Sequence, residues 1–114
     1  MNIEDIREYA ISYPDVEEGF PFGDSVLVCK VKGKIFLLLS LDASPLQFNV
    51  KCDPEIALEL REQHAAVIPG YHMNKKHWNT IIVDGSMSNK LVKEMIDMSY
   101  HLVAKTKTTR KNLK

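Results

Sequence analysis

One short segment constrains the fold more than any other, because its side chains alternate strictly between apolar and polar. The segment reads Leu46-Gln47-Phe48-Asn49-Val50-Lys51. Successive side chains of a β-strand point to opposite faces, so the alternation predicts a strand with one buried and one solvated face. Strands buried on both faces contain continuous apolar runs instead. The segment therefore predicts an antiparallel sheet with helices on one face and the other face at least partly open.

Three helices are predicted around this strand. The first begins after the N-cap Asn2 and ends before Pro14. The second begins at Asp53-Pro54-Glu55, which supplies an N-cap, a proline at the first helical position and a first-turn acid, and it ends near Gln63. The last begins after the N-cap Ser88 and carries a broad apolar stripe.

Four further strands are predicted from apolar and β-branched runs. Residues 25–31 and 35–41 form a hairpin joined by the turn Lys32-Gly33-Lys34, residues 66–68 form a short strand, and Trp78 to Val83 form a longer one. The predicted element order is α-β-β-β-α-β-β-α. The fold class is α+β, as a two-layer sandwich with a mainly antiparallel sheet.

The connection at residues 19–23 contains two phenylalanines, Phe20 and Phe22, between glycines and a proline. Large aromatic side chains favour burial, so we expect this pair to close one end of the core. Residues 1–104 are expected to form a single domain. Residues 105–114 hold five basic residues and no acid, which predicts a flexible basic tail.

The composition is that of an ordinary globular domain, with 45% apolar and 26% charged residues in 114. The longest apolar run, residues 35–39, is too short to span a membrane, and the acidic opening is unlike a signal peptide. We therefore expect a cytoplasmic protein, and a monomer, with no membrane partner. Cys29 and Cys52 are assigned to strands and predicted to be buried free thiols.

The formal net charge is zero, but the charge is unevenly distributed. Seven acidic residues and one basic residue precede residue 25, so the rest of the chain carries a compensating excess of base. A chain with zero net charge is not attracted to nucleic acid by its overall charge. One face of the folded protein can still be basic enough to bind nucleic acid.

No pattern predicts catalysis, a metal or a cofactor. His72 or His77 with Cys29 or Cys52 fits no zinc-ligand spacing, and a cysteine in a buried strand is a poor nucleophile. There is no glycine-rich phosphate loop. The sequence therefore predicts a binding protein, not an enzyme, with no cofactor and no metal site.

The most informative segment is residues 70–79, in which lysines and histidines alternate with Tyr71 and Trp78. It reads Gly70-Tyr71-His72-Met73-Asn74-Lys75-Lys76-His77-Trp78-Asn79. Cations contact phosphates and aromatic rings stack on bases, so this mixture is typical of nucleic-acid binding. An equally ordinary interpretation places Trp78 in the core, Tyr71 over a sheet edge and the lysines on a solvated loop.

The sequence resembles the MmcQ/YjbR-like proteins of bacteria. The segments that carry the resemblance are Phe20 to Gly23, Lys32-Gly33-Lys34 with Phe36, Asn49 to Glu55, and Pro69 to Thr80. The resemblance implies a compact frataxin-like fold, which is also compared with a double-wing DNA-binding domain. It implies DNA binding by analogy of fold.

Transferred onto this sequence, the polar signature of the family falls on Lys51, Lys75, Lys76, His77 and Trp78. Lys51 lies on the solvated face of its strand, so the resemblance and the alternation point to one surface. The frataxin comparison also raises iron binding. That activity needs an acidic ridge, and the acids of the first helix are interrupted and few.

The expected function is nucleic-acid binding, to duplex DNA, through these five residues. The lysines of the first hairpin are a possible second wing; they are Lys30, Lys32 and Lys34. The alternative is a module that binds a protein or small ligand at its open sheet face or in a pocket at Trp78. An enzyme comes third, and would require His72 or His77 to be oriented by a carboxylate in a cleft.

Overall fold

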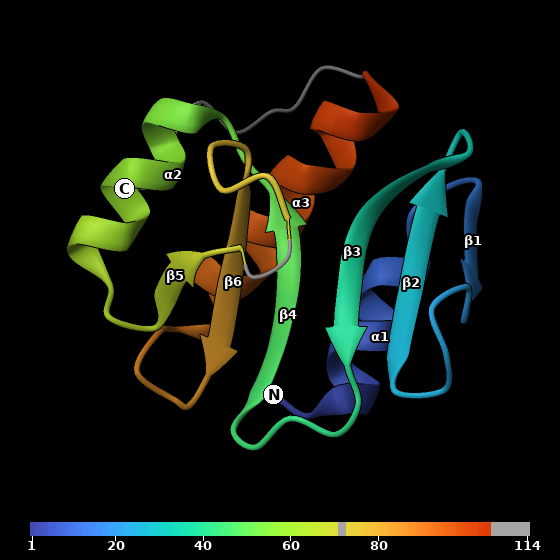
Figure 1. Ribbon diagram of the computed structural model, residues 1–114, viewed down its shortest axis with the longest axis horizontal. Coiled ribbons are helices and arrows are strands. Elements are labelled where there is room, and N and C mark those ends of the chain that lie inside the picture. The colour runs from blue at the N-terminus through green and yellow to red at the C-terminus, as the bar shows by residue number, and fades with distance from the viewer. Residues whose placement is uncertain (71–72, 106–114) are drawn as a thin grey trace.

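The computed structural model describes residues 1–70 and 73–105, which fold as one antiparallel sheet with three helices (Figure 1). The elements in chain order are α1 (Ile3–Ile11), β1 (Val16–Gly19), β2 (Val26–Val31), β3 (Lys34–Ser40), β4 (Leu46–Lys51), α2 (Pro54–Gln63), β5 (Val67–Pro69), β6 (Trp78–Val83) and α3 (Asn89–Ala104). The sheet has six strands in the order β1-β2-β3-β4-β6-β5, and all neighbouring strands are antiparallel.

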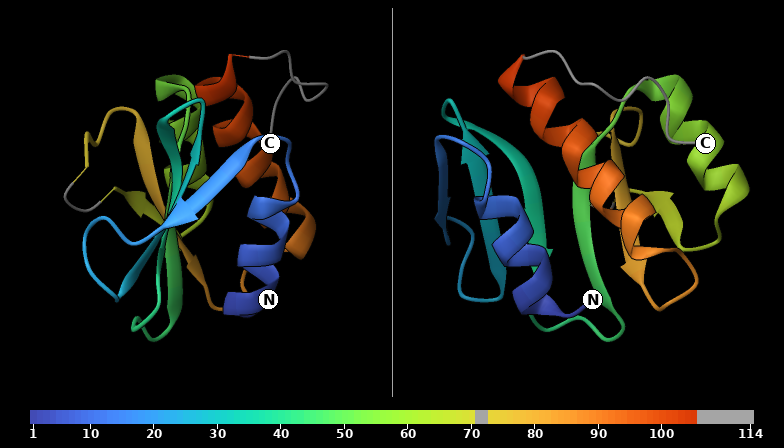
Figure 2. Two further views of the ribbon diagram at one scale, coloured as in Figure 1. Left: turned by 90° about the vertical axis from the view of Figure 1, so that its right-hand side faces the viewer. Right: turned by 180° about the vertical axis from the view of Figure 1, so that it is seen from behind.

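Helices α1 and α3 cover one face of the sheet, and α2 packs beside the edge strand β5. Figure 2 shows α3 crossing the back of the sheet, while none of the three described helices covers the front. The α+β class and the antiparallel two-layer arrangement predicted from the sequence are confirmed. We call the face without helices the open face.

The alternation in β4 places its side chains as predicted. Phe48 and Val50 are buried in the core beneath α3, whereas Gln47, Asn49 and Lys51 are half-exposed on the open face. The two faces of this strand therefore meet different environments, and its register against both neighbours is fixed by the burial of the apolar set.

The helices begin where local capping chemistry predicts. The amide of Asp5 donates to Asn2 Oδ1 at 2.8 Å, and the amide of Asn2 donates back to Asp5 Oδ2 at 2.9 Å, a capping box. The amide of Glu55 donates to Asp53 Oδ1 at 3.0 Å. Ser88 Oγ accepts the amide three residues further on at 3.1 Å. These bonds satisfy amides that have no partner within the helix.

The β2–β3 hairpin turns through only two residues. Lys32 and Gly33 have φ of 53° and 78°, and Lys34 is already the first residue of β3. A two-residue type I′ turn requires positive φ at both positions, which suits glycine and matches the twist of the strands. The predicted hairpin is confirmed, with a turn one residue tighter than expected.

Two expectations for residues 14–23 need correction. Val16–Gly19 forms the edge strand β1, to which the sequence analysis gave no element. Phe20 and Phe22 do not close the core, since they remain 51% and 64% exposed. The strand has only two half-buried positions and takes its structure from pairing with β2, a contact that no local pattern encodes.

Two further sequence predictions concern the basic C-terminal tail and the absence of a membrane-spanning segment. Lys105 closes α3 in the left-handed conformation, with φ of 58°. Residues 106–114, the main part of the predicted basic tail, lie outside the described residues. Within residues 1–70 and 73–105, no helix is both long and apolar enough to cross a bilayer.

Candidate functional site

Strands β4 and β6 place Lys51 directly opposite Trp78 in their antiparallel register. Two residues nearer the middle of the pair, Thr80 Oγ1 donates to Asn49 Oδ1 at 2.5 Å, so these side chains share a face. Alternation along each strand then puts Lys51 and Trp78 on that same open face. Trp78 is half-buried, so its ring is neither in the core nor fully exposed to solvent.

The connection that precedes β6 holds two exposed lysines next to Trp78. Asn74 organises it: its carbonyl accepts the amides of His77 and Trp78 at 3.1 and 2.9 Å, and its Oδ1 accepts the amide of Lys76 at 2.9 Å. Lys75 and Lys76 are exposed and His77 is half-buried. Among the described residues, the ammonium groups of both lysines make no ion pair and no hydrogen bond.

Arg61 of α2 fastens this connection to the body of the protein. Its Nε donates to Asn79 Oδ1 at 2.7 Å, and its Nη2 donates to the carbonyls of Lys75 and of Trp78, the latter at 3.2 Å. The planar guanidinium reaches several acceptors at once, which an ammonium cannot do in this geometry. The sequence does not indicate this role of Arg61, because a lone arginine late in a helix is normally a solvated C-terminal charge.

Gly70 allows the chain to pass close to Trp78 on the other side of this connection. Its amide donates to the carbonyl of Trp78 at 2.9 Å, and a Cβ at position 70 would lie 2.8 Å from Trp78 Cβ. A larger residue here would push β5 away from β6. The glycine therefore positions the tryptophan backbone.

A buried hydroxyl holds the end of β4. Ser99 Oγ accepts the amide of Lys51 at 2.9 Å and donates to the carbonyl of Phe36 at 2.5 Å. The amide of Cys52 donates to the carbonyl of His77 at 2.7 Å. These bonds keep the backbones of Lys51 and His77 in place, so the two lysine-bearing segments have a defined separation.

The five residues Lys51, Lys75, Lys76, His77 and Trp78, which we call the basic surface, thus lie together. Of the hairpin lysines, Lys30 lies on β2, Lys32 in the turn and Lys34 on β3, at the same end of the sheet but on its other half (Figure 1). Lys32 is directed elsewhere, because its Nζ donates to the carbonyl of Ala104 at the end of α3, at 2.8 Å. Lys30 is half-exposed and Lys34 is exposed.

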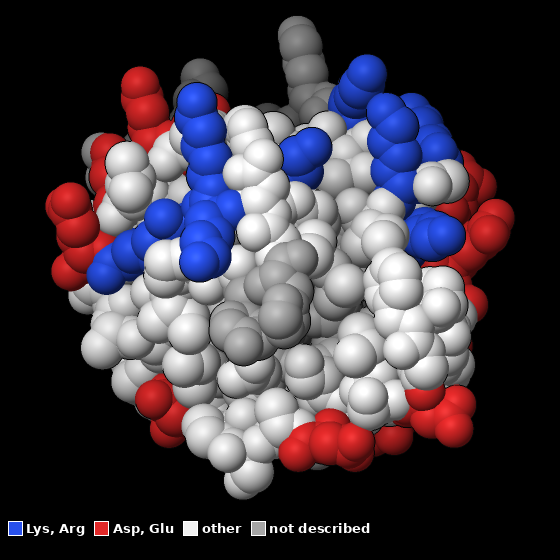
Figure 3. Space-filling view, in the orientation of Figure 1, with Lys and Arg blue, Asp and Glu red and all other residues white. Residues whose placement is uncertain are grey.

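Charge is segregated on the open face despite the net charge of zero. Figure 3 shows Lys and Arg side chains in two groups along the upper part of this face, and Asp and Glu along its lower edge and its sides. The upper end is where β4 ends, β6 begins and the β2–β3 hairpin turns. A field of this kind attracts anions to one end of the molecule.

The two cysteine thiols are poor nucleophiles in this structure. Cys29 and Cys52 are buried free thiols, and burial raises the pKa of each to about 12. The thiol form therefore prevails at neutral pH, and the thiolate is the nucleophile. Cys29 lies in β2 as predicted, whereas Cys52 follows the last residue of β4.

Only some of the residues for which a binding or catalytic role was considered are described by the structure. The predicted roles of Tyr71 and His72 lie outside the described residues. In residues 1–70 and 73–105, no three His, Cys, Asp or Glu side chains group closely enough to hold a metal ion.

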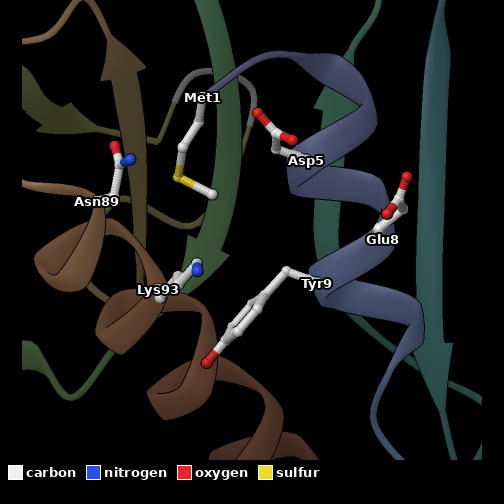
Figure 4. A pocket seen from close by; sticks show the side chains of 6 residues that line it. All are labelled: Met1, Asp5, Glu8, Tyr9, Asn89 and Lys93. Carbon is white, nitrogen blue, oxygen red and sulfur yellow. The ribbon is translucent and has the colours of Figure 1, made fainter.

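A separate cavity of about 420 Å³ lies between α1 and α3 on the helical side (Figure 4). Most of its polar groups already have partners: Asp5 belongs to the α1 capping box, Tyr9 Oη donates to Asp97 Oδ1 at 2.7 Å, and Lys93 Nζ lies 5.3 Å from the centre of the Tyr9 ring. The residues that line it carry both signs of charge. The charges that line the cavity therefore do not indicate whether a bound ligand would be an anion or a cation.

The comparison with known proteins decides the family, because residues 11–102 match the model of the YjbR family. The chain belongs to the YjbR family. It is 37% identical over 100 residues to YbdF of Escherichia coli O157:H7, which covers 88% of this chain and 82% of YbdF. It is 30% identical over 100 residues to YjbR of Escherichia coli K12, covering 88% and 85%. Both are named as uncharacterized proteins.

Solved structures share the YjbR-family fold described above. Protein DR2400 of Deinococcus radiodurans, whose domain is named DUF419, superposes with a TM-score of 0.87 at 38% identity, covering 96% of this chain and 83% of that one. A Pseudomonas syringae protein superposes with a TM-score of 0.78 at 25% identity, covering 90% and 99%. The resemblance noted in the sequence is confirmed as family membership.

Proposed function

We propose that this protein binds nucleic acid, and duplex DNA in particular, through the basic surface. The observation that carries the proposal is the register of β4 and β6, which sets Lys51 beside Trp78 with Lys75 and Lys76 in the adjoining connection. Lysine contacts with phosphates position a protein on DNA, and an aromatic side chain at the same surface packs against sugar or base. The proposed activity is binding and includes no catalytic step.

Two features of the surface support phosphate binding in preference to a structural role for the lysines. Lys75 and Lys76 have no carboxylate partner within the described part of the chain, which leaves their charges available to an anion. The backbone beneath them is held by Arg61 and by Asn74. A preorganised pair of cations loses less freedom on binding than two lysines on an unrestrained loop.

The proposal predicts a salt dependence that a double variant reduces. Each phosphate contact contributes about 0.9 to the slope of log affinity against log salt for duplex DNA. Lys75→Ala combined with Lys76→Ala should therefore flatten the slope by about two units. It should also weaken all duplex sequences similarly. Fluorescence anisotropy with a random-sequence duplex at several salt concentrations measures both effects.

The matched control removes two exposed lysines from the helical side, Lys90→Ala with Lys93→Ala, which changes the net charge equally. Its slope should stay near that of the wild type, because the charges lie away from the basic surface. Equal flattening by both double variants would indicate attraction by overall charge alone. Absence of salt-dependent binding by the wild type at micromolar concentration would exclude the proposed function.

A further inference from the structure

The connection between β1 and β2 exposes two phenylalanines that the fold does not use. Phe20 and Phe22 are 51% and 64% exposed, and the remaining residues of the connection up to residue 25 are exposed as well. Removing large aromatic rings from water lowers the free energy, and exposed apolar groups that lie close together mark interaction sites. Pro21 between them restricts the backbone, so less conformational freedom is lost when both rings bind.

The phenylalanines lie next to an unpaired sheet edge. β1 is the last strand of the sheet on its side and pairs with β2 alone. Figure 2 (left), in which β1 faces the viewer, shows no element laid along its outer edge, and the connection that follows it projects on the open side of the sheet. The outer backbone groups of an edge strand are ready to bond an added strand.

A cavity of about 270 Å³ lies where the connection folds over the sheet. Phe20, Pro21 and Val28 supply its apolar lining, and Glu17 and Lys30 are among its polar residues. Glu17 and Lys30 oppose each other in the β1–β2 register, so the cavity reaches the edge itself. An apolar side chain of a strand added to β1 could therefore enter this cavity.

The charge of this region selects the chemistry of the partner. Four acids and no base lie between residues 15 and 24, at Asp15, Glu17, Glu18 and Asp24. Arg7 binds the Glu18 carboxylate through Nη2 at 2.6 Å and Nε at 2.9 Å. The other three make no ion pair among the described residues. With Arg7 at Glu18 and Lys30 opposite Glu17, these four acids meet two bases. The surplus is negative, which repels nucleic acid and favours a basic segment.

A second copy of this chain fits the edge poorly. Antiparallel pairing of two β1 strands would bring Glu17 and Glu18 of one copy against the same residues of the other, and like charges directly opposite each other are destabilising. Charged side chains on an edge strand are a usual protection against such self-pairing. A basic strand would meet the same glutamates favourably.

We propose that β1 and the Phe20–Phe22 connection form a docking surface for an extended, basic and apolar segment of another protein, which adds to the sheet as a seventh strand. The backbone of the segment bonds the edge of β1, its basic side chains lie beside Glu17, and an apolar side chain enters the cavity against Phe20. This surface is distinct from the basic surface and serves a different class of partner.

The test uses the full chain labelled with nitrogen-15 and a synthetic ten-residue peptide in which lysine and valine alternate at every second position, with threonine between them, so that both kinds of side chain point to one face. We expect chemical-shift changes centred on residues 16–25, and slower hydrogen exchange of outward-facing β1 amides when the peptide is bound. The same peptide with glutamate in place of lysine should bind at least about tenfold more weakly, because the repulsion replaces an attraction. A peptide methylated at every backbone nitrogen should also fail, because it lacks the donors needed to extend the sheet.

Phe22→Ser should weaken binding of the lysine peptide by about tenfold or more while the unfolding midpoint stays near that of the wild type, since the ring is exposed. The matched control is Leu58→Ser, which removes a similarly exposed apolar side chain, 57% exposed, from α2 on the other side of the molecule. Its affinity should not change.

Equal binding of the lysine and glutamate peptides, or unchanged affinity of Phe22→Ser, would overturn the proposal. A dimer in sedimentation equilibrium that Phe22→Ser dissociates would assign the surface to a second copy instead. Shift changes of residues 16–25 on addition of duplex DNA would assign it to nucleic acid. Either result would reject the basic protein segment as partner.

Discussion

Arg61 is the residue on which the geometry of the basic surface depends most directly. It is half-buried and donates to the side chain of Asn79 and to the carbonyls of Lys75 and Trp78. Hydrogen bonds from a charged donor contribute about 1.5–3 kcal/mol each, although contributions to one group do not add in full. Much of the order of the Lys75–Trp78 connection therefore depends on one side chain from a different element.

We predict that Arg61→Ala lowers the free energy of unfolding by about 1–3 kcal/mol, because it leaves acceptors without their donor. Arg61→Lys should recover only part of this loss, since one ammonium cannot reach all three acceptors. Urea unfolding measures the change. The control Arg7→Ala removes an arginine whose side chain is 38% exposed and forms a surface ion pair, and it should move the midpoint less. Equal effects of the two alanine variants would contradict the role assigned to Arg61.

At the scale of elements, α3 is joined to the sheet by Ser99 as well as by apolar packing. Ser99 is fully buried, and its hydroxyl connects the carbonyl of Phe36 in β3 to the amide of Lys51 in β4. The register of β2 against β3 shifts at Lys30, so that Phe36 and Leu37 are both buried in succession. This irregularity breaks the ladder beside Phe36, and the helix supplies the donor for its carbonyl.

We predict that Ser99→Ala destabilises the fold by about 1–3 kcal/mol, because a buried carbonyl and a buried amide each lose their partner. The amide of Lys51 should exchange with deuterium faster in this variant, as measured by NMR. Ser12→Ala removes a hydroxyl that donates to the carbonyl of Tyr9 at an exposed position, where water replaces it, and should cost less. Unchanged exchange at Lys51 would show that the serine does not hold the strand end.

The stability of the whole molecule depends on groups that remain protonated in the core. Burial raises the pKa of Cys29 and of Cys52 to about 12. The pKa of Tyr13 is raised above its ordinary value by burial and by the hydrogen bond that its hydroxyl donates to Asp97. In the unfolded chain these groups lose their protons at lower pH, so alkaline solution favours unfolding.

We predict that the free energy of unfolding is insensitive to these groups below about pH 8 and falls from about pH 9 towards pH 12. Each group that ionises only in the unfolded chain contributes a slope of about 1.4 kcal/mol per pH unit. Urea midpoints at pH 8 and pH 10.5 measure the fall, and Cys29→Ala should reduce it relative to the stability of that variant at pH 8. A midpoint that is equal at both pH values would contradict the prediction.

Elements whose causes are local could be predicted from the amino-acid sequence alone. Period-two alternation specified β4 and its two faces, and the N-caps Asn2, Asp53 and Ser88 specified where the helices begin. Each of these signals acts within a few residues, so it can be recognised without knowledge of the fold. The α+β class followed from them. The family resemblance, which the comparisons confirmed, came instead from motif segments such as Pro69 to Thr80.

Which residues meet and which remain in solvent depends on contacts between distant parts of the chain. β1 exists because β2 offers it a partner, and Phe20 and Phe22 stay exposed because none of the described elements covers that edge of the sheet. Arg61 reaches the Lys75–Trp78 connection only because α2 packs beside β5. These contacts depend on chain segments far apart in sequence, and their free energy comes from packing and pairing that no local pattern encodes.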